Sequence, residues 1–216
     1  MNSAFSTPPV VKHIIIANCV MLLATSLLPF SDKLYEYLAL FNPESPFFRS
    51  YQVVTYMFLH ADLSHLFFNM FALWMFGRVL EYQLSSQRFV TYYLICGIGA
   101  ALLQLLVGWF EYSSAVEQAG MQTARFLLQV PTVGASGAVF GLLLAFGVLH
   151  PNAPIYMMFF PVPIKAKWFV IIYGVIELLL GMSGRQPGVA HYAHIGGMLW
   201  GYLLLWWWKR QGVIRY

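Results

Sequence analysis

Charged residues are scarce in this chain, since Asp, Glu, Lys and Arg together make up 9% of its 216 residues. A water-soluble domain carries about 25% charged residues, so a surface that faces mostly water is excluded. Hydrophobic residues reach 60% and aromatic residues 18%, which is typical of apolar spans with aromatic belts at the membrane interface. The length suits one domain. We expect residues 1–216 to form a single membrane domain in the lipid bilayer.

Cysteine is also rare. Cys19 and Cys96 each lie in an apolar run, which predicts packed thiols rather than a disulfide and indicates no particular compartment. The net charge of +4 does not indicate nucleic-acid binding, because the basic residues are spread between apolar runs and form no single patch. We therefore expect no nucleic-acid partner.

Six apolar runs approach the length of about 20 residues that a membrane-spanning helix needs. The predicted spans are 10–30, 64–83, 89–110, 136–150, 166–183 and 192–208. The first is interpreted as a helix rather than a signal peptide, because it is long for a signal and no small-residue cleavage site follows it. The predicted fold is an all-α bundle of six membrane-spanning helices. Two long outer segments, 31–63 and 111–135, are functional candidates because unstructured loops of that length are uncommon.

Lysine and arginine are unevenly divided between the two sides that six spans create. Eight lie on the side of both chain ends: Lys12, Arg78, Arg88, Lys165, Lys167, Lys209, Arg210 and Arg215. Four lie on the other side: Lys33, Arg49, Arg125 and Arg185. Cytoplasmic loops carry an excess of these residues, so both ends are predicted to be cytoplasmic.

Two kinds of protease site are missing. The sequence has no His-Glu-x-x-His motif of a metalloprotease, and no Asp lies within a predicted span, which excludes an aspartyl pair inside the membrane. Because no Asp lies in a span, no carboxylate is evident that would orient a histidine such as His194 in a catalytic triad. Glu177, deep in the fifth span, is expected to be neutral or hydrogen-bonded, with Gln104 as a possible partner. We expect its role to be structural.

Four polar side chains are predicted to lie at one depth in the membrane. His65 and Asn69 fall in the first turns of the second span, Ser136 opens the fourth, and His194 lies in the first turn of the sixth. All three spans start at the outer face, so a rise of about 1.5 Å per residue puts these side chains in the outer third of the bilayer. Polar groups are costly there and are functional candidates.

The chemistry of these side chains predicts a serine hydrolase site. A serine hydroxyl needs a base to take its proton, and His194 is the candidate base for Ser136 and the later proton donor to the leaving amine. His65 and Asn69 share one helix face. Together with the backbone N–H of Ser136 at a helix start, they are predicted to stabilise an oxyanion. A Ser-His dyad is the simplest interpretation.

Small residues are predicted to bring the fourth and sixth spans together. Gly137 and Gly141 are four apart in one span, and Gly197 and Gly201 are four apart in the other. Such faces allow helix backbones to touch, and their contact would bring the predicted nucleophile to the predicted base. Phe140 lies one turn into the fourth span, where its ring is able to pack beside the imidazole.

Each of these features alone has a plainer structural explanation. A serine among glycines is a small contact residue, a single histidine is a satisfied core residue, and Asn69 is an interhelical hydrogen-bonding residue. Joint placement at one depth is what favours catalysis. A small transporter that uses the histidines and Glu177 as a proton path is an alternative. The groups cluster rather than trace a route, however, and no inverted repeat is evident.

Three stretches carry a resemblance to a known family. They are His60-Ala-Asp-Leu-Ser-His65-Leu-Phe-Phe-Asn69, Gly134-Ala135-Ser136-Gly137 and Ala193-His194-Ile195-Gly196-Gly197. In this order they resemble the three signature stretches of rhomboid proteases, which are intramembrane serine proteases. One stretch alone is a weak signal, but three on the expected spans are specific. The resemblance covers nearly all of the chain.

The resemblance implies a six-helix rhomboid fold with a catalytic dyad at Ser136 and His194. It implies that His65 and Asn69 assist the oxyanion and that no metal or cofactor is needed. The implied substrates are single-span membrane proteins, cut near helix-destabilising sequence. No added domain is visible, which is similar to the minimal bacterial form, so a bacterial inner membrane is the expected location. A catalytically inactive family member that only binds membrane proteins is the alternative.

One stretch departs from the family. The first outer segment often carries a Trp-Arg pair in this family, and the matching stretch here reads Tyr51-Gln52. The resemblance therefore does not imply the details of that segment. Residues 183–190 flank His194 and are rich in glycine. With the fifth span, they are a hypothetical gate for substrate.

Overall fold

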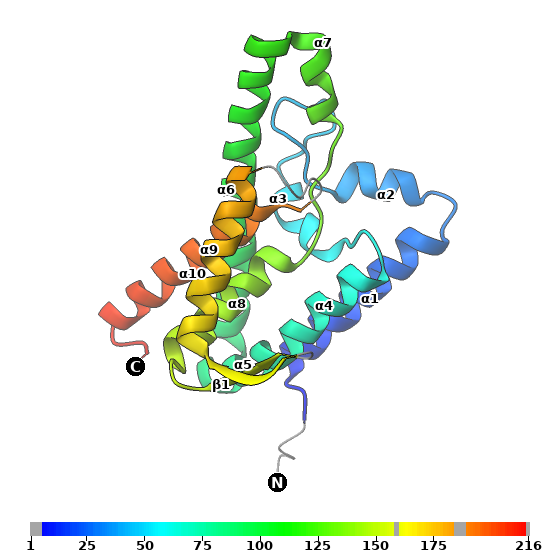
Figure 1. Ribbon diagram of the computed structural model, residues 1–216. Helices are drawn as coiled ribbons and strands as arrows, with labels where there is room; N and C mark the ends of the chain where they lie inside the picture. Colours follow the sequence, from blue (N-terminus) through cyan, green and yellow to red (C-terminus); the bar gives the residue numbers. More distant parts are fainter. Residues whose placement is uncertain (1–5, 158–159, 184–188, 215–216) are drawn as a thin grey trace.

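The computed structural model describes residues 6–157, 160–183 and 189–214 as a bundle of helices with one β-hairpin (Figure 1). The helices are α1 (Pro9–Leu27), α2 (Ser31–Leu38), α3 (Gln52–Thr55), α4 (Leu63–Ala72), α5 (Arg78–Leu84), α6 (Ser86–Ala119), α7 (Met121–Ala124), α8 (Ser136–Leu149), α9 (Ala166–Ser183) and α10 (His191–Arg210). The 3₁₀ helices are η1 (Tyr56–Phe58) and η3 (Arg125–Leu128), and η2 (Leu73–Gly77) is a π-helical turn. The strands are β1 (Pro154–Met157) and β2 (Phe160–Lys165). Residues 184–188 of the hypothetical gate lie outside the described residues.

Each predicted span coincides with helical residues. Within the described ranges, four helices are long and apolar enough to cross a membrane: α1, the continuous helix Leu63–Leu84, α6 and α9. Helix α8 is apolar but has 14 residues. Helix α10 has 20 residues, but its histidines and glycines lower its mean hydropathy. The predicted helical membrane fold is therefore confirmed.

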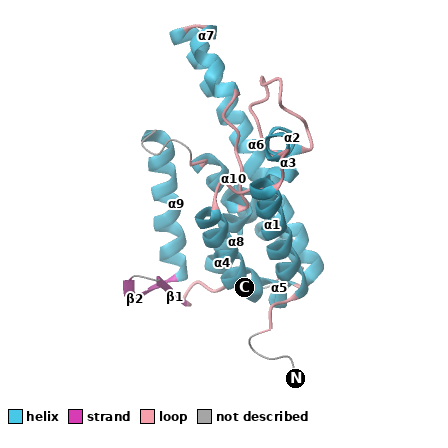
Figure 2. Cartoon of the chain, turned by 90° about the vertical axis from the view of Figure 1, so that its right-hand side faces the viewer, coloured by secondary structure: helices cyan, strands magenta, loops and turns pink. Residues whose placement is uncertain are grey.

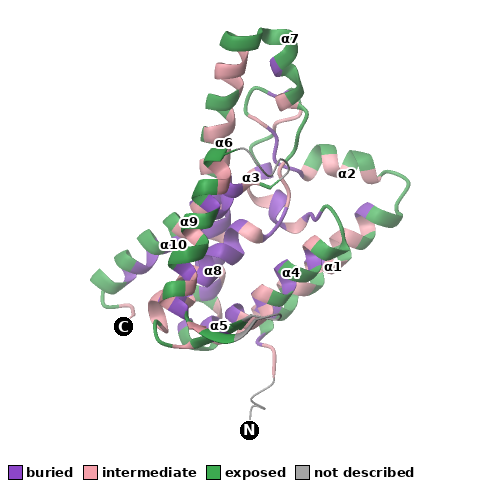
Figure 3. Ribbon diagram, in the orientation of Figure 1, coloured by how far each residue is buried: buried purple, intermediate pink, exposed green. Residues whose placement is uncertain are grey.

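Helices α6, α8 and α10 form the centre of the bundle. Helix α10 packs against both α6 and α8, and α6 also packs against α8. Buried residues gather on these three helices, whereas α1 and α9 present largely exposed outer faces (Figure 3). Helix α9 stands at one side of the bundle (Figure 2). Exposed apolar side chains on it, such as Ile172, are what a helix presents to lipid.

The outer segments contain more helix than the sequence predicted. Helix α6 continues to Ala119, beyond the predicted end of the third span at residue 110, and α7 and η3 follow it. Hydropathy predicts where a span leaves the lipid, whereas helix propensity decides where the helix itself ends, so the helix is longer than the predicted span. The β1–β2 hairpin between α8 and α9, which pairs Ile155 with Ile164, was not predicted either. Its prolines obscured it, since proline is depleted in strands.

Gln52 organises the first outer segment. Its side chain is fully buried, and its amide nitrogen donates to the carbonyl oxygens of Phe47 at 2.9 Å and Tyr37 at 3.2 Å. Its amide oxygen accepts from the backbone N–H of Arg49 at 3.1 Å. The sequence departs from the family at this residue, and here a neutral amide joins three turns of the chain.

Two contacts tie the outer segments to the bundle. The buried Tyr56 hydroxyl donates to the carbonyl oxygen of Gly97 on α6 at 2.8 Å. Backbone hydrogen bonds between Leu40 and Thr132 run in both directions, at 3.0 and 2.8 Å, and join the first outer segment to the second. The chain therefore enters α8, which begins four residues after Thr132, from an anchored strand-like segment.

A buried carboxylate caps the first helix. Glu81 of α5 accepts from the backbone N–H groups of Val10 at 3.1 Å and Val11 at 2.9 Å. It also accepts from the Ser86 hydroxyl at 2.6 Å. The start of α1 has no side-chain cap of its own, and its N–H groups need acceptors. The carboxylate of Glu81, although it lies in the second predicted span, is therefore engaged in hydrogen bonds, including those that hold the start of α1.

Candidate active site

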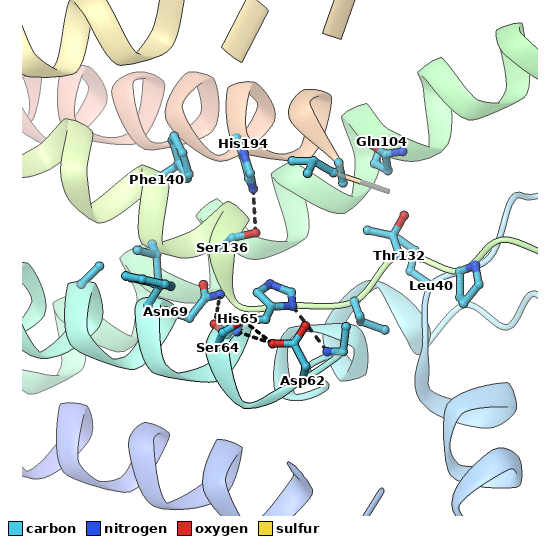
Figure 4. Close-up of a pocket in the computed structure, with 18 of the residues that line it drawn as sticks. Leu40, Asp62, Ser64, His65, Asn69, Gln104, Thr132, Ser136, Phe140 and His194 are labelled. Carbon is cyan, nitrogen blue, oxygen red and sulfur yellow. Dashed lines mark hydrogen bonds between the residues drawn. The ribbon is translucent and has the colours of Figure 1, made fainter. Parts of the chain in front are cut away.

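Ser136 is the first residue of α8 and follows a turn that favours glycine. Gly134 has a φ of +126°, a conformation that strains residues with a Cβ. A Cβ on Gly134 would lie 2.8 Å from Nε2 of His65 and 3.7 Å from Oγ of Ser136. The glycine therefore allows the imidazole and the hydroxyl to approach the same point, as Figure 4 shows.

The structure brings together the two side chains that the sequence predicts as nucleophile and base. Oγ of Ser136 and Nε2 of His194 are 2.8 Å apart (Figure 4). The ring of Phe140 stacks on the His194 imidazole, with centroids 4.1 Å apart and planes 6° from parallel. The hydrogen bond and the stacking together restrict the orientation of the imidazole.

A carboxylate lies within hydrogen-bond distance of His194, so the expectation that no such carboxylate was evident was wrong. Oε2 of Glu177 on α9 lies 2.8 Å from Nδ1 of His194 and 2.7 Å from Nδ1 of His191. All three side chains are buried. The expected partner of Glu177, Gln104, does not contact it. The amide oxygen of Gln104 is buried without a hydrogen-bond partner among the described residues.

The sequence contained a signal for this carboxylate. Glu177 lies six residues before the end of α9 at Ser183, which is about 9 Å of helix, and the fifth span ends at the outer face. His191 and His194 are three residues apart, so they share one helix face. Depth alone therefore places the carboxylate beside the two imidazoles. The prediction considered Asp residues alone.

His65 presents a hydrogen-bond donor toward Ser136. The backbone N–H of Ala61 donates to Nδ1 of His65 at 3.4 Å. A neutral imidazole that accepts at Nδ1 carries its proton on Nε2, and Nε2 is the atom beside Gly134. His60 packs edge-on against His65, with ring centroids 4.9 Å apart, and so limits its tilt.

Asn69 lies one turn further along α4. Its amide nitrogen donates to the carbonyl oxygen of His65 at 2.9 Å, which leaves its second N–H for another acceptor. Asp62 caps α4 by accepting from the backbone N–H of His65 at 2.8 Å and from the Ser64 hydroxyl at 2.6 Å. These hydrogen bonds, that of Ser64 first, lower the pKa of Asp62, so the cap stays ionised.

The four predicted packing glycines do not all serve one contact. A Cβ on Gly197 would lie 1.8 Å from the carbonyl oxygen of Gly137, so Gly197 lets α10 touch α8. A Cβ on Gly137 would first meet Ala100 of α6, at 2.4 Å. Cβ atoms on Gly141 and Gly201 would likewise first meet Cys96 at 2.4 Å and the hydroxyl of Tyr92 at 2.4 Å, respectively. Both of those side chains belong to α6, so these two glycines also mainly accommodate α6.

A cavity of about 1400 Å³ opens at these side chains. Ser136, His194, His65 and Asn69 all line it. Figure 4 shows His194 on one side of Ser136 and the two α4 side chains on the other. The rest of the lining is largely apolar and includes side chains of η3, such as Phe126. The cavity is therefore able to accept an extended peptide segment beside the hydroxyl.

The Glu177, His191 and His194 donor atoms lie within 4.8 Å of one another, which is the composition of a three-ligand metal site. Donor atoms around a tetrahedral zinc are about 3.3 Å apart, given bonds of about 2.0 Å. The Oε2 to Nδ1 separations here are 2.7 and 2.8 Å. These are hydrogen-bond distances, so the cluster is built to share protons.

Comparison with known proteins agrees with this geometry. The family model of the Rhomboid domain matches residues 48–211, which is more than half of the chain. The chain therefore belongs to the rhomboid family, as its three signature stretches indicated, and it is an integral membrane protein.

Similar curated proteins come from several lineages. The chain is 34% identical to Rhomboid protein 1, mitochondrial, of Saccharomyces cerevisiae, over 69% of this chain and 39% of that protein. It is 32% identical to Rhomboid protease AarA of Providencia stuartii, over 68% of this chain and 52% of that protein. The chain thus spans about half or less of the length of these relatives. Membership of this family supports intramembrane proteolysis in general.

Proposed function

We propose that this protein is an intramembrane serine endopeptidase in which Ser136 is the nucleophile and His194 is the general base. The observation that carries the proposal is the 2.8 Å hydrogen bond between Oγ of Ser136 and Nε2 of His194 at the wall of the cavity. A hydroxyl with an adjacent base of this geometry is the minimal apparatus for acyl transfer. Water, as the second substrate, completes the hydrolysis.

In the first half of the reaction, Oγ of Ser136 attacks the peptide carbonyl carbon, and its proton passes to Nε2 of His194. The carbonyl oxygen becomes an oxyanion. Nε2–H of His65, the second N–H of Asn69 and the backbone N–H of Ser136 are the proposed donors to it, each contributing about 10²–10³-fold in rate. The C–N bond then breaks, and His194 returns the proton to the leaving amine.

In the second half, His194 takes a proton from water as the water oxygen attacks the acyl carbon. The Ser136 ester bond breaks, and the serine oxygen regains the proton. Stacking of Phe140 on the imidazole face at 4.1 Å supports the cationic form of His194 that exists between these transfers. Each proton therefore moves between atoms that already lie within hydrogen-bond reach.

The proposed substrates are single-span membrane proteins, cut near helix-destabilising sequence. Such a segment is able to leave its helix and lie extended in the cavity beside Ser136. We further propose that α8 and α10 also cross the bilayer, which gives six spans with both chain ends in the cytoplasm. The proposed location is a bacterial inner membrane.

The test is cleavage of a model single-span substrate by the purified, reconstituted protein and by Ser136→Ala and His194→Ala variants. Cleavage by the native chain that both variants lose is the expected result. Persistent cleavage by Ser136→Ala would contradict the assignment of the nucleophile. Binding of the substrate without cleavage by any of the three would favour the inactive binder. Proton flux across vesicles that depends on Glu177 would favour the transporter.

A further inference from the structure

We infer that Glu177 is a positioning residue for catalysis, whose carboxylate holds His194 with its proton on Nδ1 and the lone pair of Nε2 directed at Ser136. This inference rests on the proposed function and deepens it, because it adds a third member, from α9, to the pair on α8 and α10. The simplest prediction from the sequence was a dyad. The hydrogen bonds instead form a continuous chain from Ser136 through His194 to Glu177.

The hydrogen-bond partners of His194 determine which of its ring nitrogens carries the proton. An ionised carboxylate only accepts hydrogen bonds, so Oε2 of Glu177, at 2.8 Å, requires the proton of His194 on Nδ1. A neutral imidazole then carries no proton on Nε2, and that nitrogen is free to accept from the Ser136 hydroxyl at 2.8 Å. The opposite tautomer of His194 would leave Ser136 without a base.

His191 anchors the carboxylate from the neighbouring helix. Its Nδ1 lies 2.7 Å from the same Oε2 of Glu177, so it is a second donor. Its Nε2 is buried and has no hydrogen-bond partner among the described residues. A buried N–H without a partner is costly, and a charged one more so, so His191 is neutral. The negative charge of Glu177 is therefore not cancelled by His191 and remains available to His194.

Charge compensation explains why a carboxylate is placed here. Glu177 from α9 and His191 from α10 itself are titratable side chains that contact the His194 ring. Others line the same cavity, among them Tyr173, His65, Asp62 and Glu111. Of the carboxylates among these, Glu177 is the one that is hydrogen-bonded to His194. When His194 takes the serine proton, the pair becomes a hydrogen-bonded ion pair in a medium of low dielectric. Glu177 thus favours the protonated imidazole that the first step creates.

The first experiment compares native protein with Glu177→Gln, Glu177→Asp and Glu177→Leu in cleavage of the model substrate across pH. Glutamine retains an acceptor oxygen but no charge. We expect kcat to fall about 10²-fold and KM to stay within about twofold, since general base catalysis contributes about 10²–10⁴-fold. The acid limb of the kcat profile should move to lower pH. Leucine should lose more, and aspartate should regain part of the lost rate.

Glu81→Gln is the matched control. Glu81 is equally buried and accepts three hydrogen bonds, but it caps α1. Like Glu177 it lies outside the cavity lining, but its hydrogen-bond partners are Val10, Val11 and Ser86 rather than His194. We expect Glu81→Gln to lower thermal stability without moving the acid limb. If the Glu177 variants behave in the same way, with an unmoved acid limb and a loss explained by unfolded protein, Glu177 is only structural and the inference is overturned.

A second measurement needs no variant that has to fold. Nitrogen-15 NMR of the native protein with labelled histidine distinguishes a protonated from an unprotonated ring nitrogen. A His194 signal with a protonated Nδ1 and an unprotonated Nε2 is expected, and the reverse tautomer would overturn the inference. If native protein and Ser136→Ala are equally inactive, both the proposed function and this inference are wrong. If only Ser136→Ala is inactive and Glu177→Gln matches native protein, the inference alone fails.

Discussion

The α-carbon of Gly197 faces the carbonyl oxygen of Gly137 so closely that a Cβ on Gly197 would lie 1.8 Å from that oxygen. This contact fixes how far α10 stands from α8. His194 lies three residues before Gly197, and Ser136 lies one residue before Gly137. The contact therefore also fixes the distance between His194 and Ser136. The separation of the proposed nucleophile and base thus depends on the absence of a side chain at Gly197.

Replacement of Gly197 by alanine is expected to abolish most activity. The atom that the Cβ meets is backbone, so the helices must separate, at a cost of about 3 kcal/mol in the free energy of unfolding. A shift of about 1 Å at the site costs about 10²-fold in rate. Gly108→Ala in α6 is the control, because its Cβ meets nothing closer than 3.4 Å. Full activity of Gly197→Ala would contradict the role of this contact.

Asn69→Ala is expected to lower kcat by about 10²-fold through the loss of one oxyanion donor. Asn18 in α1 offers a matched control. Its amide nitrogen donates to the carbonyl oxygen four residues earlier, at 2.8 Å, as that of Asn69 does at 2.9 Å. Asn18→Ala should change stability alone. Equal kcat values for the two variants would show that Asn69 is only an internal helix contact.

Gln52→Leu is expected to destabilise the protein by about 2 kcal/mol, because it leaves several part-buried backbone groups without their hydrogen-bond partner. The carbonyl oxygen of Phe47 loses the hydrogen bond that it accepts from the Gln52 amide nitrogen. The N–H of Arg49 loses the amide oxygen of Gln52 as its acceptor. Thermal unfolding in detergent measures the effect. A neutral result would mean that the outer segment is held by other contacts, such as that of Tyr56 with Gly97.

His60 is expected to make stability fall in mild acid. Burial, and secondarily the neighbouring His65, lower the pKa of His60 to about 4, whereas an unfolded histidine has a pKa of about 6.5. Between these values the unfolded chain binds more protons, so the free energy of unfolding falls as pH falls from 6.5 to 4, by up to about 3 kcal/mol. The His60→Phe variant keeps a ring and should lack this component. Parallel pH curves for the two proteins would contradict it.

The orientation is testable with single cysteines in a background without Cys19 and Cys96. Gln118 lies at the end of α6 and Gln211 follows α10, and both are exposed. If the chain ends are cytoplasmic, a membrane-impermeant maleimide added to intact cells should label Gln118→Cys and spare Gln211→Cys. The reverse pattern would show the opposite orientation. Labelling after lysis is the control for reactivity.

Several features of the site were predictable from sequence because they depend on local rules. Hydropathy located the helices that carry His65, Ser136 and His194, and the helical rise placed these side chains at one depth. The same rules did not predict that the third helix continues to Ala119, because a polar helix outside the lipid gives no hydropathy signal. These rules also did not predict the β1–β2 hairpin between α8 and α9.

The sequence by itself determined that the chain is a helical membrane protein. It also predicted that Ser136 and His194 lie at the same depth in the bilayer. These conclusions follow from hydropathy and helix geometry, which are properties of single segments. Only the tertiary structure decided that Glu177 meets His194 and that Gly141 faces α6. The rotation and spacing of neighbouring helices settle which side chains touch. Those quantities come from the packing of whole helices, which no single stretch of sequence encodes.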